Sequence, residues 1–122
     1  MAIQLAIGET HSGDVTLLTL AGRLVADDED TFFADTVNKL LAAGRIRIVA
    51  DLREVSSIDS GGVGTLVAKL LSARRRGGDL RLLRPSDRCR RVLEITRLIE
   101  VFQVFESEGE ALASFGPQVA HR

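Results

Sequence analysis

The sequence predicts an α/β fold built around a mixed β-sheet, and three observations support this class. Short apolar runs with alternating or β-branched residues recur along the 122-residue chain. Segments with apolar residues at helical spacing separate most of these runs. The resulting order of elements is β-β-α-β-α-β-α-β-α. Strands that alternate with helices after one hairpin imply parallel central strands joined by right-handed crossovers.

The first two strands are expected to form a hairpin through a turn at residues 12–14, and Gly22 is expected to end this pair. The third strand, rich in Ile and Val, is expected to stop at Asp51, one loop before Ser60. The expected strands cover residues 3–7, 15–20, 45–51, 80–83 and 101–105.

The expected helices have apolar residues at helical spacing, for example at i, i+4, i+7 and i+8 in the first and at i, i+3, i+4, i+7 and i+8 in the second. They run from near residue 29 to Gly44, from residue 60 to Gly77 and Gly78, from Pro85 onward, and from Ser107 to 115. The second helix has the clearest apolar face, which comprises Val63, Leu66, Val67, Leu70 and Leu71.

Length and composition indicate one globular domain, residues 1–116, followed by a loose tail at 117–122. The formal net charge is −1, and the chain has five Phe but no Trp or Tyr, which argues against binding of single-stranded nucleic acid. The single cysteine, Cys89, leaves no internal disulfide and is expected to be buried. No signal peptide or apolar run of membrane-spanning length is visible, so we expect a cytoplasmic protein.

The segment V-S-S-I-D-S-G-G-V-G-T-L-V, residues 55–67, carries the candidate chemistry. A serine hydrolase would need a base near Ser60, but the only histidines are His11 and His121. The nucleophile-elbow pattern G-x-S-x-G fails because Ile58 occupies the place of the first glycine. A P-loop fails because no lysine follows Gly64 directly. We therefore expect no enzyme and no catalytic residue.

The spacing alone favours Ser60 as a helix N-cap, a role typically worth about 1 kcal/mol. That role does not explain Gly61 and Gly62, because glycine costs roughly 1 kcal/mol in a helix relative to alanine. The glycines would suit a helix end that a partner approaches closely. Asp51, at the expected end of a strand, leaves a phospho-accepting receiver as a minor alternative, although the acidic pair and late lysine of receivers are not visible.

The segment I-D-S-G-G-V-G-T-L-V, preceded by I-V-A-D-L-R-E-V-S-S, resembles the signature of the STAS domain family, in particular the bacterial anti-sigma factor antagonists. The resemblance extends to G-R-L, R-R-R-G-G-D-L-R-L-L-R-P-S and R-V-L-E-I-T-R-L-I-E-V-F, and it ends at S-E-G-E-A-L-A-S-F. It covers nearly the whole chain. The resemblance implies a mixed sheet with helices packed mainly on one face.

By this resemblance, Ser60 is the residue phosphorylated by a partner that is both a serine kinase and an anti-sigma factor. Unmodified protein would bind that factor and free sigma, so regulating transcription, and modified protein would release it. A phosphatase is a further implied partner, and no cofactor or metal is implied because the ATP belongs to the kinase. The implied partner-binding residues are Asp59, Ser60, Gly61, Gly62, Val25, Asp27 and Asp28.

Two positions depart from the family pattern. The family commonly has Asp after G-x-L and often a second serine after the acceptor, where this chain has Val25 and Gly61. The acids follow at residues 27–30 instead, so the neighbouring loop is expected to select a different partner. Ser56 and Ser57 are weaker alternative acceptors, whose ordinary role would be that of turn residues.

The sequence leaves other functions and partners open. STAS domains also occur as scaffolds in stress-signalling assemblies and in lipid-transport machinery, without a phosphorylation switch. An exposed edge strand leaves both a monomer and a weak homodimer open. Eight arginines lie within residues 74–91. They need not share a face, so we expect a solvated surface that steers an acidic partner rather than a site for nucleic acid or membrane.

Overall fold

The computed structural model describes residues 5–25 and 31–116, and these residues build a five-stranded mixed sheet in the order β1-β2-β3-β4-β5. β1 pairs with β2 in antiparallel fashion, and the other neighbouring strands run parallel. The predicted mixed α/β class is confirmed. The elements are β1 (Leu5–Ser12), β2 (Val15–Leu24), α1 (Phe32–Ala42), β3 (Arg47–Ile58), α2 (Ser60–Arg75), β4 (Asp79–Leu83), α3 (Asp87–Ile95), the 3₁₀ helix η1 (Leu98–Glu100), β5 (Val104–Phe105) and α4 (Glu108–Ala113).

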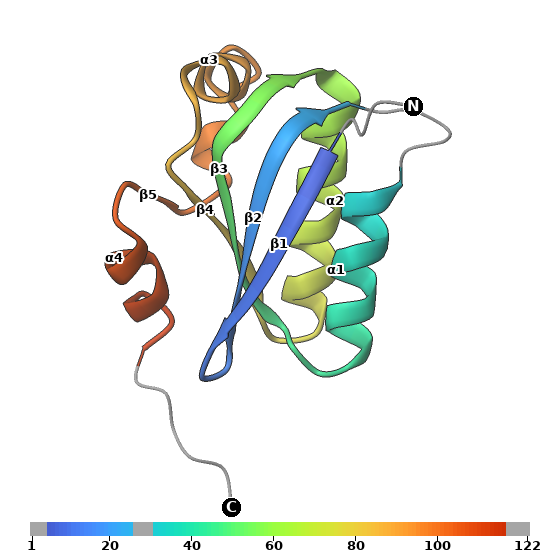
Figure 1. Cartoon of the computed structure of the whole chain (residues 1–122), viewed down its shortest axis with the longest axis vertical. Coiled ribbons are helices and arrows are strands. Elements are labelled where there is room, and N and C mark those ends of the chain that lie inside the picture. Colours follow the sequence, from blue (N-terminus) through green and yellow to red (C-terminus); the bar gives the residue numbers. More distant parts are fainter. Residues whose placement is uncertain (1–4, 26–30, 117–122) are drawn as a thin grey trace, which may run out of the picture.

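The helices cover the two faces of the sheet unequally (Figure 1). α1 and α2 lie side by side on one face, and α3 packs near the carboxyl end of β3 and contributes Cys89 and Leu93 to the same core. α4 lies on the opposite face, where Ala111 closes a smaller apolar cluster with Val15 and Leu83. The helices therefore lie mainly on one face, as the resemblance implies.

β2 and β3 are both longer than predicted. Gly22 is the last residue of β2 whose pairing with β1 is described, opposite Leu5, but β2 itself continues to Leu24, and Gly22 also pairs with Val55 in β3. The pairing of β2 with β3 continues to Leu24 opposite Ile58, although its register shifts along the way. Val55 and Ile58 are buried. The polar segment expected to form a loop is therefore the second half of β3, held by its pairing with β2.

Three helix and strand predictions need correction. α1 begins at Phe32 after the N-cap residue Thr31, rather than near residue 29. On α2, Leu71 is 46% exposed, because the buried face is centred on Leu66 and Leu70. The predicted strand at 101–105 is reduced to two residues, because η1 and a turn occupy the chain before Val104.

Parts of two predictions fall outside the described residues. These are the acidic residues at 27–30 and the loose tail expected at 117–122.

Candidate functional site at the start of α2

The start of α2 follows β3 with only one intervening residue, Asp59. Asp59 has extended backbone angles, and its carboxylate accepts a hydrogen bond from the Gly62 amide at 2.7 Å. Its carbonyl oxygen accepts a second bond from the Val63 amide at 3.0 Å. Asp59 is therefore the N-cap, and the prediction that Ser60 caps the helix after a loop is wrong. Capping is worth about 1 kcal/mol, and it fixes where the helix begins.

Ser60 is the first residue of α2, and its side chain is exposed. At this position the amides of Ser60 and Gly61 have no acceptor within the helix, since the first turn of any α-helix lacks preceding carbonyls. The helix dipole adds a partial positive charge at the same end. The site combines an accessible hydroxyl with surroundings that tolerate a negative charge on it.

Gly62 joins the start of α2 to the end of β2. It is buried, and a Cβ built on it would overlap the carbonyl group of Leu24. Glycine is therefore required by a close approach of backbone to backbone within the chain. This replaces the prediction that both glycines of the pair keep the helix end clear for a partner. The contact places Val25, the next residue after Leu24, beside the start of α2.

Gly64 has the opposite environment to Gly62. It is exposed, and no atom of the described residues, apart from the backbone of its own helix, lies within 4 Å of the position where its Cβ would be. Residues four apart lie on the same side of a helix, so Gly64 is on the side of α2 that carries Ser60. The surface next to the Ser60 hydroxyl is therefore bare on this side, which leaves room for another molecule to approach.

The structure thus brings together five of the predicted partner-binding residues and leaves two undescribed. Asp59, Ser60, Gly61 and Gly62 form the first turn of α2, and Val25 lies next to it through the Leu24 contact. The other two residues are Asp27 and Asp28, which lie outside the described residues.

Two of the other candidate acceptors, Ser56 and Asp51, are less suitable than Ser60. Ser56 is exposed, but its hydroxyl donates a hydrogen bond to the Gly22 carbonyl at 3.2 Å. Asp51 does not lie at a strand end, because β3 continues to Ile58. Its buried carboxylate pairs with Arg84 at 3.0 Å and accepts the Arg53 amide at 3.0 Å. A phosphoryl donor has no access to such a carboxylate, which argues against the receiver alternative.

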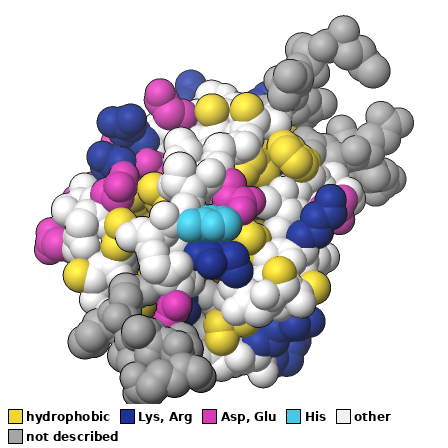
Figure 2. Space-filling view, turned by 60° about the horizontal axis from the view of Figure 1, so that its bottom comes forward, with side chains coloured by type: hydrophobic (Ala, Val, Ile, Leu, Met, Phe, Trp, Pro, Cys, Tyr) yellow, Lys and Arg dark blue, Asp and Glu magenta, His cyan; other side chains and the backbone are white. Residues whose placement is uncertain are grey.

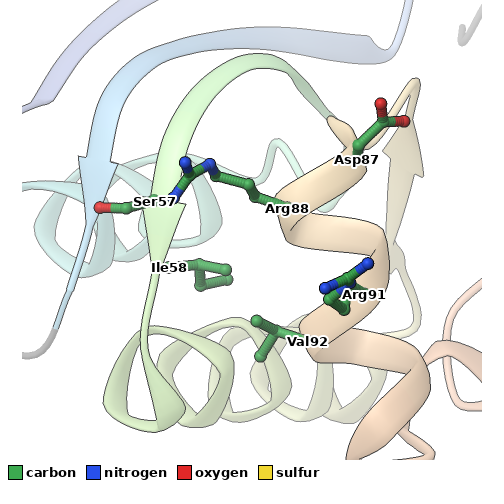
Figure 3. Close-up of a pocket in the computed structure, with 6 residues that line it drawn as sticks. All are labelled: Ser57, Ile58, Asp87, Arg88, Arg91 and Val92. Carbon is green, nitrogen blue, oxygen red and sulfur yellow. The ribbon is translucent and has the colours of Figure 1, made fainter.

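A groove beside this site was not foreseen from the sequence. It lies between the end of β3 and α3 and has a volume of about 650 Å³. Figure 3 shows Arg88 extending from α3 toward β3, with Arg91 further along α3 and Ile58 and Val92 at the apolar side of the groove. We call this the α3 groove, defined by its lining residues Ser57, Ile58, Asp87, Arg88, Arg91 and Val92.

The arginine run does not form one continuous basic face. Figure 2 shows Lys and Arg side chains interspersed with Asp and Glu over the surface in view. Several arginines belong to structural ion pairs, and Asp79 alone holds Arg74 and Arg81, each at 2.9 Å. Arg81 also stacks on the ring of Phe115 at 3.9 Å and so helps to hold α4. Within the described part of the chain, no helix has the length and apolar character needed to cross a membrane.

Comparisons with known proteins agree with this architecture. The STAS domain family model matches residues 7–111. An anti-sigma-B factor antagonist from Listeria monocytogenes is 36% identical over 90 residues, which cover 70% of this chain and 79% of the relative. A crystal structure of a candidate anti-sigma factor antagonist from Thermotoga maritima has a TM-score of 0.80 and 27% identity, and the match covers 88% of this chain and 92% of that one.

A third comparison bears on the fold alone, because the identity is only 21%. The Bacillus cell fate determinant SpoIIAA, in its phosphorylated form, has a TM-score of 0.69, and the match covers 90% of this chain and 99% of that one. The family match spans most of the chain, and the mixed sheet with its helices agrees with the folds of these solved structures. The chain therefore belongs to the STAS domain family.

Proposed function

We propose that this protein is an anti-sigma factor antagonist that acts by partner switching. Unmodified, it binds an anti-sigma factor that is also a serine kinase, and sigma is released. Phosphorylated on Ser60, it dissociates from that factor. The observation that carries the proposal is the exposed Ser60 hydroxyl at the first position of α2, in a chain whose relatives include an anti-sigma-B factor antagonist.

The physical basis of the switch is a local change of charge and bulk. A phosphate adds a charge of about −1.5 to −2. At the start of α2 the unpaired amides and the helix dipole offset this charge, so the fold survives modification. The effect is then exerted on the partner, which meets a bulky anion where a small hydroxyl stood. The existence of a phosphorylated form of SpoIIAA, a protein of the same fold, supports this expectation.

The contact surface is proposed to centre on the first turn of α2 and to include Val25, Asp27 and Asp28. The bare surface at Gly64 extends it along the helix. The kinase supplies ATP and the catalytic groups, so this chain has a regulatory rather than an enzymatic role and needs no cofactor. A phosphatase would restore the binding form, and the cycle would take place in the cytoplasm.

The direct test is intact-mass analysis of the protein after incubation with a candidate kinase and ATP. We expect the mass to increase by one phosphoryl group in the native protein and to stay unchanged in Ser60→Ala. In binding assays, Ser60→Ala should bind the kinase constitutively and Ser60→Asp poorly. Both variants should unfold at temperatures close to that of the native protein. Equal affinity of the two variants would rule out the switch.

A scaffold or transport-complex subunit without a switch is the alternative within the family. It would show no phosphorylation and would co-purify with a large homotypic assembly or a membrane transporter. A small ATP-binding partner would instead support the proposed switch.

A further inference from the structure

We propose that the α3 groove is a second contact area for the partner and that it accepts an acidic segment with an apolar residue next to its acids. The partner's identity rests on the proposed function. The chemistry of the groove rests on the charge, exposure and spacing of its own residues.

The arginines of the groove differ from the other arginines of the run. Six of the eight arginines between residues 74 and 91 donate to an acceptor within the described chain, whereas Arg88 and Arg91 have no ion pair or hydrogen bond there. Their guanidinium groups are therefore available to a ligand. The six engaged arginines are Arg74, Arg75, Arg76, Arg81, Arg84 and Arg90.

The outward face of α3 carries both charge and apolar surface. Arg88, Arg91, Val92 and Ile95 follow the spacing i, i+3, i+4 and i+7, so they lie along one side of the helix. Val92 lines the groove, and Ile95 is 75% exposed, more than any other large hydrophobic residue in the described part of the chain. Val92 and Ile95 thus form a small apolar strip beside two arginines that have no ion pair or hydrogen bond within the described chain.

The acids near the groove do not neutralise it. Asp87 lines its edge, but Figure 3 shows its carboxylate pointing away from Ile58 and Val92. Glu106 is engaged by Arg90 at 2.6 Å, and Arg90 does not line the groove. Two cations therefore face a single acid, and charge complementarity selects an anionic occupant.

The occupant that fits best is an amphipathic helix of the partner. Carboxylates one helical turn apart can reach Arg88 and Arg91, which are themselves one turn apart on α3. An aliphatic or aromatic side chain beside those carboxylates can cover Val92 and Ile95. A mononucleotide or free phosphate would use the arginines but would leave the apolar strip exposed.

The charge of this groove explains why a phosphate on Ser60 would weaken binding of the partner. Its β3 side is formed by Ser57 and Ile58, which immediately precede Asp59 and Ser60. A phosphate on Ser60 would lie at the edge of a surface that binds acids. It would repel the acidic segment and compete with it for the arginines. The effect of Ser60→Asp on binding should therefore weaken as ionic strength rises, because salt screens exposed charges.

The first experiment measures affinity for the anti-sigma factor kinase with full-length variants. Arg88→Glu and Arg91→Glu should each weaken binding about fivefold or more at low salt. Ile95→Ala should weaken it at all salt concentrations. Arg75→Glu is the matched control, since it makes the same charge change at the last residue of α2, and we expect its affinity to be close to native. If the groove variants bind as well as Arg75→Glu, the inference is wrong, although the proposed function can stand.

The second experiment tests the groove without the partner. Amide chemical shifts of the ¹⁵N-labelled protein are followed during titration with a synthetic peptide carrying Glu and Leu at helical spacing. Shifts should change at α3, Ser57 and Ile58, and Arg91→Glu or a peptide with Lys in place of Glu should abolish the changes. No localised change, or binding only to inorganic phosphate, nucleic acid or anionic vesicles, would overturn the inference. If no kinase binds the native protein, the proposed function fails, and this titration still decides the chemistry of the groove.

Discussion

Replacing Gly62 with alanine tests the backbone contact that joins the end of β2 to the start of α2. The added Cβ would overlap the carbonyl group of Leu24 and lie 3.1 Å from Cγ1 of Ile58. Leu24 is fixed by its pairing with Ile58, so the clash cannot be relieved by rotating a side chain. Overpacking typically costs about 1–3 kcal/mol, and a backbone obstacle places this site at the upper end. The higher helix propensity of alanine offsets about 1 kcal/mol of this cost, so we expect the free energy of unfolding to fall by about 2 kcal/mol.

Gly64→Ala is the matched control on the same helix. Its Cβ would meet no atom of another described segment within 4 Å, so we expect only the gain in helix propensity, up to about 1 kcal/mol. Urea denaturation of both variants, analysed with a common m value, should separate their free energies of unfolding by about 3 kcal/mol. A Gly62→Ala protein as stable as Gly64→Ala would refute the steric role of Gly62, because it would mean that the backbone at the end of β2 can move aside without a loss of stability.

Three further predictions follow from the site and the core. Asp59→Ala should lower the free energy of unfolding by about 1 kcal/mol through loss of the cap, measured by urea denaturation, with Ser60 unchanged as the acceptor in mass analysis. Asp51→Asn should cost about 2 kcal/mol in the same assay, because it leaves the Arg84 guanidinium without its counter-charge. Burial raises the pKa of the Cys89 thiol above its ordinary value of 9.0, against a smaller opposing effect of its hydrogen bond with Ser86. The Cys89 thiol therefore ionises at a lower pH in the unfolded chain than in the folded one. The free energy of unfolding should fall above pH 9, and Cys89→Val should remove the part of this fall that Cys89 causes.

The order of elements could be predicted because it depends on local apolar spacing. The same spacing places the start of α2 within one residue, but it assigns the cap to Ser60 instead of Asp59. Both residue types cap helices well, so spacing cannot separate them. The choice is made by Ile58, whose burial and pairing with Leu24 fix where β3 ends.

The remaining differences arise from contacts between distant parts of the chain. The segment R-E-V-S-S has little strand propensity, and it is extended because β2 pairs with it. The reason for Gly62 is a carbonyl group on another strand. The spacing of Arg88 and Arg91 is visible in the sequence. Their availability is not, because it depends on which neighbouring arginines find acids elsewhere, as Arg90 does with Glu106.

The single-residue junction between β3 and α2 constrains any enzyme that modifies Ser60. The acceptor is already wound into a helix that is anchored to the interior of the sheet, so it cannot be drawn out as an extended strand without dismantling the first turn. The enzyme must therefore dock on the surface of the folded protein, and a short peptide with the same sequence around Ser60 would be a poor substrate. An unfolded copy of the protein would lack this surface, so the enzyme would not recognise it and the unfolded copy would not enter the cycle.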